Sequence, residues 1–220
     1  MTSVLIVDDQ ELIRTGLELV LRGRGIEVRG QVGNGREAIE LTQKCDPDVV
    51  LMDIRMPVLD GVAATRELTK LGARARVLIL TTYDADRLVY EALRAGAAGF
   101  LLKTTPPDQL VAGIETVAAG ESLLAPSLTR RLIEEHLRRP PPYDRVPRVL
   151  QDLTQRELEV FTMISRGLAN DQIAKSLVLS EATVKTHVNR ILAKLDLRSR
   201  VQAVVLAYES GLIRPGERGS

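Results

Sequence analysis

The sequence predicts an α/β fold: a five-stranded, doubly wound parallel sheet, followed by a small all-α domain of four helices. Short, wholly apolar segments at residues 4–7 and 49–52 are typical of central parallel strands, which are buried on both faces. Such segments alternate with amphipathic helical stretches over the first half of the chain, as they do in successive βα units. After residue 150 only the helical pattern remains.

Five strands and five helices are expected in the first domain, which we place at residues 1–118. The predicted strands are residues 4–7, 26–32, 49–52, 77–80 and 99–102. The predicted helices lie near residues 12–21, 38–41, 62–71, 84–95 and 107–117. Gly33, Asn34 and Gly35 form a turn signal, and Pro107 suits the first turn of the fifth helix.

Residues 119–150 are predicted to be a linker with a short helix at 127–137, ended by three prolines. The helical domain, residues 151–215, begins with a capping box formed by Thr154 and Glu157. Asn170 and Ser180 are the expected N-caps of the next two helices. A last helix covers residues 199–210 and ends at Gly211.

The overall charge of +1 hides an uneven distribution. Residues 1–118 carry 14 Lys and Arg against 17 Asp and Glu, whereas residues 151–220 carry 10 against 8. A mildly basic C-terminal part gives weak support for a nucleic-acid partner. The single cysteine, Cys45, excludes an intramolecular disulfide framework, and no apolar run approaches the length of a membrane span. We therefore expect a soluble cytoplasmic protein that has no membrane partner.

Three carboxylates follow the ends of two predicted strands. Asp8 and Asp9 come directly after the first strand, and Asp53 comes after the third. Ligands of parallel sheets collect at the carboxyl ends of the strands, so these acids are expected to converge. A hard divalent cation with oxygen ligands would relieve their repulsion. The sequence thus predicts a Mg²⁺ site around a reactive aspartate.

Two further polar residues end neighbouring strands, Thr81 the fourth and Lys103 the fifth. A hydroxyl, a lysine and Mg²⁺ beside a carboxylate can support phosphoryl transfer to that carboxylate. With Met56, Pro57, Gly61 and the Gly99-Phe100-Leu101-Leu102-Lys103 segment, the set resembles the receiver domain of two-component response regulators over residues 1–118.

The resemblance assigns roles to these residues. Asp53 would accept phosphate from a sensor histidine kinase. Asp9, Asp53 and the backbone carbonyl of Arg55 would ligate Mg²⁺, while Asp8 would act through a water molecule. Lys103 would pair with the phosphoryl group.

The resemblance also implies a switch, in which Thr81 moves toward the phosphoryl group and lets Phe100 turn inward. Physically this is a bistable packing element biased by about two new negative charges.

Aspartyl-phosphate hydrolases of the haloacid-dehalogenase type provide an enzymatic alternative. They need a second acid two residues after the nucleophile to protonate the leaving group. Arg55 occupies that position and cannot act as an acid. We therefore expect a protein that is not an enzyme.

Residues 170–195 suggest a short helix, a tight turn and a longer helix. Val184, Val188 and Ile191, with Leu192 and Leu195, form an apolar stripe on the longer helix. The other face is small, polar and cationic, as in a helix that enters the major groove. A merely solvated polar face remains the alternative.

The surrounding residues Leu153–Glu157, Gly167–Asn170 and Ser180–Asn189 resemble the LuxR-type helix-turn-helix. A receiver followed by this module resembles response regulators of the NarL/FixJ class. By position, Lys185, Thr186 and Asn189 would face bases. The expected backbone contacts are Thr183, His187, Arg190 and Arg198.

We therefore expect a phosphorylation-controlled transcriptional regulator that binds promoter DNA as a homodimer. Two alternatives remain open: a regulator whose DNA binding is independent of phosphorylation, and a receiver that signals mainly through protein partners.

Overall fold

The computed structural model describes residues 1–81, 86–120 and 148–213. The chain divides into two compact units, Met1–Leu123 and Leu124–Ser220, and each is described by itself. The predicted helix at 127–137 and the proline-rich linker lie outside the described residues.

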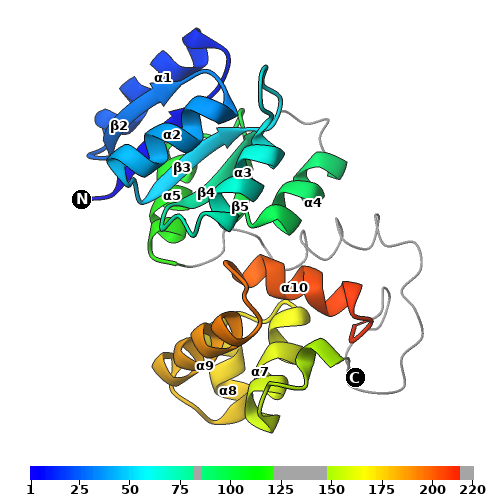
Figure 1. Ribbon diagram of the computed structural model, residues 1–220. Coiled ribbons are helices and arrows are strands. Elements are labelled where there is room, and N and C mark those ends of the chain that lie inside the picture. Colours follow the sequence, from blue (N-terminus) through cyan, green and yellow to red (C-terminus); the bar gives the residue numbers. More distant parts are fainter. Residues whose placement is uncertain (82–85, 121–147, 214–220) are drawn as a thin grey trace. The chain divides into compact units, whose positions relative to one another are not determined.

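The first unit is built on a parallel sheet with the strand order β2-β1-β3-β4-β5 (Figure 1). Its strands are β1 (Ser3–Val7), β2 (Glu27–Val32), β3 (Val49–Asp53), β4 (Arg76–Thr81) and β5 (Gly99–Leu102). All residues of β1 and β3 are buried, as their uninterrupted apolar sequences predict. The five predicted strands are confirmed, with bounds that differ by at most one residue.

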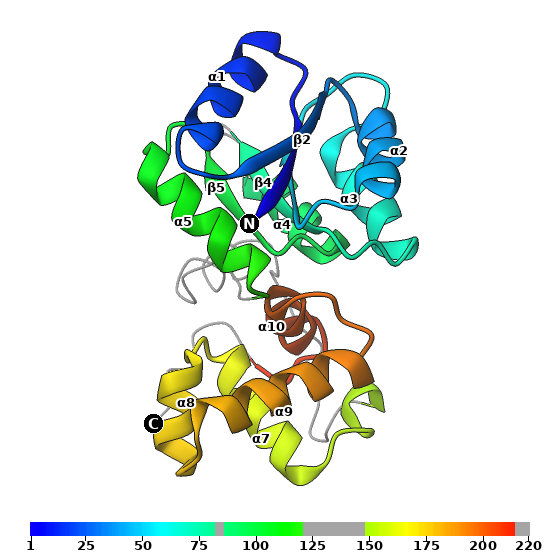
Figure 2. The same cartoon turned by 90° about the vertical axis from the view of Figure 1, so that its left-hand side faces the viewer.

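Five helices cover the two faces of the sheet. They are α1 (Glu11–Arg22), α2 (Gly35–Cys45), α3 (Gly61–Lys70), α4 (Asp86–Ala95) and α5 (Pro107–Ala118). Helices α1 and α5 lie on one face, and α2, α3 and α4 on the other (Figure 2). The doubly wound α/β fold class is confirmed, and Pro107 occupies the first turn of α5 as predicted.

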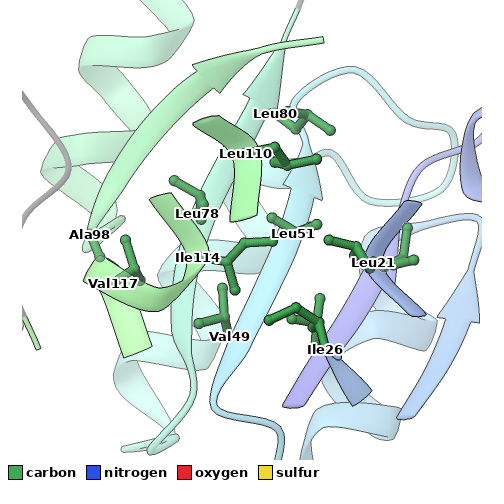
Figure 3. Close-up of a cluster of buried hydrophobic side chains, with 12 residues drawn as sticks. Leu21, Ile26, Val49, Leu51, Leu78, Leu80, Ala98, Leu110, Ile114 and Val117 are labelled. Atoms are coloured by element: carbon green, nitrogen blue, oxygen red, sulfur yellow. The ribbon is translucent and has the colours of Figure 1, made fainter. Parts of the chain in front are cut away.

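The core under α1 and α5 is formed by alternate residues of the strands (Figure 3). Val49 and Leu51 of β3 and Leu78 and Leu80 of β4 point to this side. Leu21 of α1 and Leu110, Ile114 and Val117 of α5 pack onto them. Each fully buried side chain of this size contributes roughly 1.5–3 kcal/mol. The packing fixes the strands, and with them the residues at the strand ends.

The second unit is helical. It contains a 3₁₀ turn, η1 (Arg148–Leu150), and the helices α7 (Gln155–Ser165), α8 (Asn170–Leu177), α9 (Glu181–Lys194) and α10 (Arg200–Glu209). The capping box of Thr154 and Glu157 is present, and Ser180 and Ser199 cap α9 and α10 through their side chains. The predicted four-helix domain is confirmed.

The prediction that Asn170 is the N-cap of α8 is wrong. The N-cap is Ala169, whose backbone N–H donates to Oε1 of Gln172 at 2.8 Å. Asn170 is the first helical residue, and its Oδ1 accepts from Nη1 of Arg200 at 2.6 Å. The other nitrogen of that guanidinium, Nη2, donates to the carbonyl of Leu168. The side chain expected to cap the helix therefore accepts a hydrogen bond from Arg200, 30 residues further along the chain.

An ion pair between the buried Glu157 and the exposed Lys194 links α7 to the end of α9. Nζ of Lys194 lies 2.6 Å from Oε2 of Glu157 and also donates to the carbonyl of Asp152 at 3.1 Å. Glu157 is only 4% exposed. The hydrogen bond from Lys194 outweighs the opposing effect of burial and, with the bonds from Thr154, lowers the pKa of Glu157 to about 2. The pair fixes the C-terminal end of α9 against α7.

We predict that Glu157→Gln lowers the free energy of unfolding of this unit by roughly 1–3 kcal/mol at neutral pH, because the charge-assisted hydrogen bond to Lys194 is lost. The folded-state pKa of Glu157 lies below its ordinary value, 4.5. The stability that it contributes is therefore present above that value and is lost as the pH falls through about 2. The difference between variant and wild type should shrink over the same range.

Urea unfolding followed by far-UV circular dichroism at several pH values measures this difference. Glu159→Gln is the matched control, because its ion pair with Arg156 is solvent-exposed and should contribute less than about 1 kcal/mol. Equal stability of Glu157→Gln and wild type at pH 7 would contradict the assignment.

Candidate functional site

The polar residues predicted at the strand ends lie along one edge of the sheet. Asp8 directly follows β1, Asp53 is the last residue of β3, Thr81 is the last residue of β4, and Lys103 directly follows β5. The strand order reverses between β1 and β3, so the chain after one strand enters α1 and after the other enters α3, on opposite faces. Such a switch point leaves a crevice at the carboxyl ends of the two strands.

An ion-paired network lies at these strand ends. Nζ of Lys103 lies 2.6 Å from Oδ2 of Asp8 and 3.0 Å from Oδ2 of Asp53. Asp8 is 1% exposed and Asp53 is 7% exposed. Oδ1 of Asp53 accepts from the backbone N–H of Ile54 at 2.8 Å. Asp53 and Lys103, 50 residues apart in the sequence, are thus in direct contact.

Burial is the largest influence on the pKa of Asp53 and raises it above the ordinary value, although the hydrogen bond and charge of Lys103 oppose the shift. Burial alone would lower the pKa of Lys103. The close ion-pair contacts with Asp8 and Asp53 outweigh that effect and raise the pKa of Lys103 instead. Lys103 is therefore held as a cation against the two acids.

The carboxylates of Asp8, Asp9 and Asp53 can bring one oxygen each within 4.8 Å of one another. Oδ2 of Asp8 is buried and, although close to Lys103, does not form a hydrogen bond of good geometry. Asp9 is exposed at the rim. One lysine does not balance three clustered acids, and oxygen ligands suit a hard cation. The residues present fit Mg²⁺.

The loop between β3 and α3 approaches Asp53 closely because of a glycine. A Cβ atom at Gly61 would lie 2.0 Å from the carbonyl oxygen of Asp53. The N–H of Gly61 instead donates to the carbonyl of Ile54 at 2.9 Å, and the Asp60 side chain caps α3. Arg55 is exposed in this loop and lines an open hollow together with Asp9. Arg55 and Asp9 thus line the same open hollow next to Asp53.

Thr81 and Phe100 lie on adjacent strands. Thr81 is 4% exposed, and its carbonyl accepts from the N–H of Lys103 at 2.7 Å. Phe100 is half-buried in β5, where it pairs with Ile79 of β4. The backbone therefore links the predicted hydroxyl residue to the site lysine.

The sequence interpretation missed two residues that hold Asp8. Nη1 of Arg14 donates to the Asp8 carbonyl at 2.7 Å, and the N–H of Gln10 donates to Oδ1 of Asp8 at 2.9 Å. The only sequence feature that could have indicated the contact of Arg14 with Asp8 is a cationic residue about one helical turn after residue 10. Such a residue is usually solvated, so the signal is weak.

In the second unit, the predicted apolar stripe of α9 faces inward. Val184, Val188 and Ile191 are buried. The predicted base-facing residues Lys185, Thr186 and Asn189 are all exposed. Helix α9 thus presents its polar face to solvent within this unit.

The predicted backbone-contact residues differ in their surroundings. Arg190 and Arg198 are exposed. The hydroxyl of Thr183, also exposed, lies 2.8 Å from that of the N-cap Ser180. His187 is half-buried, and its Nδ1 is buried without a hydrogen-bond partner among the described residues. The Nδ1 side of His187 is therefore packed inside the unit, while part of the residue remains accessible to solvent.

Two families match the chain in this order. Residues 4–115 match the response regulator receiver domain, and residues 151–207 match the bacterial regulatory proteins of the luxR family. The chain is a response regulator of this receiver–LuxR class. It therefore belongs to the two-component transcriptional regulators, and receiver domains typically bind Mg²⁺ at an acidic pocket.

The similarity extends over nearly the whole chain. The transcriptional regulatory protein LnrK of Bacillus subtilis is 40% identical over 217 residues, which cover 96% of this chain and 99% of that protein. The response regulator VraR of Staphylococcus aureus is 36% identical over 96% of this chain and 99% of its own length. The crystal structure of the response regulator ChrA, from a heme-sensing two-component system, is 34% identical, with a TM-score of 0.52. It covers 96% of this chain and 98% of ChrA.

Among the helices that the structure describes, none has the length and apolar character needed to cross a membrane.

We predict that Gly61→Ala lowers the free energy of unfolding by at least about 2 kcal/mol, because the new methyl group must displace the loop from Asp53. The displacement should also weaken Mg²⁺ binding measured by isothermal titration calorimetry. Gly16→Ala is the control: a Cβ there meets nothing within 4 Å, and alanine should stabilise α1 by about 0.5–1 kcal/mol. Unchanged stability and Mg²⁺ affinity in Gly61→Ala would refute the role of this close approach.

Proposed function

We propose that this response regulator accepts a phosphoryl group on Asp53 from a sensor histidine kinase and, in response, binds promoter DNA as a homodimer. The observation that carries the proposal is the position of Lys103, which contacts both Asp8 and Asp53 beside three clustered carboxylates. This arrangement offers a nucleophile, a fixed cation and a cation site at one point.

The chemistry follows from the charges. An oxygen of the ionised Asp53 carboxylate attacks the phosphorus atom, and the bond from phosphorus to the leaving group breaks. Because Ile54 holds Oδ1 of Asp53 through a hydrogen bond, the carboxylate has a fixed orientation before the reaction. Lys103 is already in place to neutralise charge on the phosphoryl oxygens.

Asp9, Asp53 and the backbone carbonyl of Arg55 would hold Mg²⁺, with Asp8 acting through a water molecule. When bound, Mg²⁺ would neutralise the phosphoryl oxygens. Two observations support the indirect role of Asp8: its Oδ1 already accepts from Gln10, and its Oδ2 faces Lys103.

The phosphoryl group would then draw Thr81 toward it and release space for Phe100. The hydrogen bond between the Lys103 N–H and the Thr81 carbonyl couples the two strand ends, which supports this path. We place the receiver at residues 1–118, the linker at 119–150 and the DNA-binding domain at 151–215, and we expect the protein to act in the cytoplasm.

Helix α9 would enter the major groove, where Lys185, Thr186 and Asn189 face the bases. The backbone contacts would come from Thr183, His187, Arg190 and Arg198. Six of these seven residues are exposed, and His187 is half-buried at the edge. Two copies of the chain would bind two half-sites related by two-fold symmetry.

We expect intact-mass analysis after incubation with acetyl phosphate and Mg²⁺ to show one phosphoryl adduct on the wild type and none on Asp53→Asn. Asp60→Asn is the control, because Asp60 caps α3 in the same loop and should not abolish the adduct. If no adduct forms, beryllofluoride with Mg²⁺ distinguishes fast hydrolysis, in which the protein still dimerises, from an incompetent site. An adduct on Asp53→Asn equal to that on wild type would contradict the assignment.

A further inference from the structure

The centre of the exposed face of α9 is occupied by short side chains. Ala182, Thr186, Asn189 and Ala193 recur at intervals of four, three and four residues, and all four are exposed. At this spacing they share one face of an α-helix. The longer side chains of Lys185 and Arg190 lie on the two sides of this stripe. The helix is therefore narrowest where it would meet the floor of a groove.

This narrow stripe determines which side chains can reach a base. Asparagine and threonine are short, so they contact base edges only if the helix backbone comes close to the DNA. Alanines at 182 and 193 permit that approach at both ends of the stripe. Lysine and arginine are long enough not to need that approach. From the flanks, Lys185 can still reach a base edge, and Arg190 can reach phosphates, whose contacts carry no sequence information.

The hydrogen-bonding state of the two polar residues narrows the choice of base. The Thr186 hydroxyl donates to the carbonyl of Ala182 at 3.0 Å, so its methyl group, rather than a donor, is available to a ligand. Within the part of the chain that the structure describes, the side-chain amide of Asn189 makes no hydrogen bond, so it retains its donor and its acceptor. An asparagine amide matches N6 and N7 of adenine, and a threonine methyl matches the thymine methyl.

We propose that Asn189 reads an adenine in the major groove and that Thr186 contacts the methyl group of a thymine in an adjacent base pair. Three residues advance an α-helix by about 4.5 Å, close to the roughly 3.4 Å between successive base pairs. Each half-site therefore contains two neighbouring A·T pairs at its centre of contact. This inference rests on the proposed function, in which α9 enters the major groove.

The probe is obtained by selection from a random duplex library with the full-length wild-type protein, treated with beryllofluoride and Mg²⁺. Each adenine of the enriched half-site is replaced in turn by 7-deazaadenine, which lacks the N7 acceptor. At one position we expect the wild type to lose roughly tenfold or more in affinity. Asn189→Ala should bind the normal and modified duplexes equally.

The thymine contact has its own pair of substitutions. Deoxyuridine, which lacks the methyl group, should weaken wild-type binding a few-fold at an adjacent base pair. It should leave Thr186→Ser unaffected, because serine lacks the matching methyl. Arg190→Gln is the control, since loss of a phosphate contact should weaken all duplexes alike and reduce the salt dependence.

The outcomes separate the inference from the proposed function. One outcome is an enriched sequence in which no 7-deazaadenine replacement lowers the affinity of the wild type more than that of Asn189→Ala. In that case the adenine contact of Asn189 is wrong, and the proposed DNA binding stands. If selection enriches no sequence at all, both the inference and the proposed DNA-binding role fail.

Discussion

Lys103 in contact with both Asp8 and Asp53 is the interaction on which the N-terminal unit depends. Buried parallel strands bring the acids to one edge, where like charges repel. The lysine is 11% exposed and lies within 3.0 Å of an oxygen of each acid. Removing one member of such a pair leaves a buried charge uncompensated, at a cost of about 3–5 kcal/mol. Lys103 reaches the acids only when β5 pairs in register with β4, so the sheet and the site form together.

This arrangement is also compatible with the proposed switch. Three acids with one lysine leave a net negative charge, so the network would accept Mg²⁺ and then a phosphoryl group without any change of fold. The loop after β3 is fixed by the close approach of Gly61, and the Asp8 turn is fixed by Arg14. In the proposed switch, new charge would therefore act on the strand ends and on Thr81, where the backbone is linked to Lys103.

The strands and the acidic site were predictable from the sequence because each depends on local pattern. Apolar runs identify buried strands, and the residue that follows each run lies at the carboxyl edge. What remained hidden depends on contacts between distant residues. Arg200 donates a hydrogen bond to Asn170, which was expected to cap a helix, and Lys194 donates one to Glu157, 37 residues earlier in the chain. No local pattern records such pairs, because either partner alone resembles an ordinary solvated side chain.

In the helical unit, too, local features were predictable and contacts between distant residues were not. Its caps at Thr154 and Ser180 agree with the sequence prediction, since capping depends on neighbours within one turn. The orientation of α9 depends instead on the Glu157–Lys194 ion pair and on the apolar stripe. The polar face of α9 is consequently presented by a rigid support, as sequence-specific contacts require.

The central claim is that the state of Asp53 controls DNA binding. The most direct measurement is the affinity of the full-length protein for its selected duplex, by fluorescence anisotropy, with and without beryllofluoride and Mg²⁺. We expect the affinity to rise for the wild type and to stay constant for Asp53→Asn. Native mass spectrometry shows whether beryllofluoride is bound. Equal affinity of the wild type in both conditions, with beryllofluoride bound, would contradict control by Asp53 and establish DNA binding that is independent of phosphorylation.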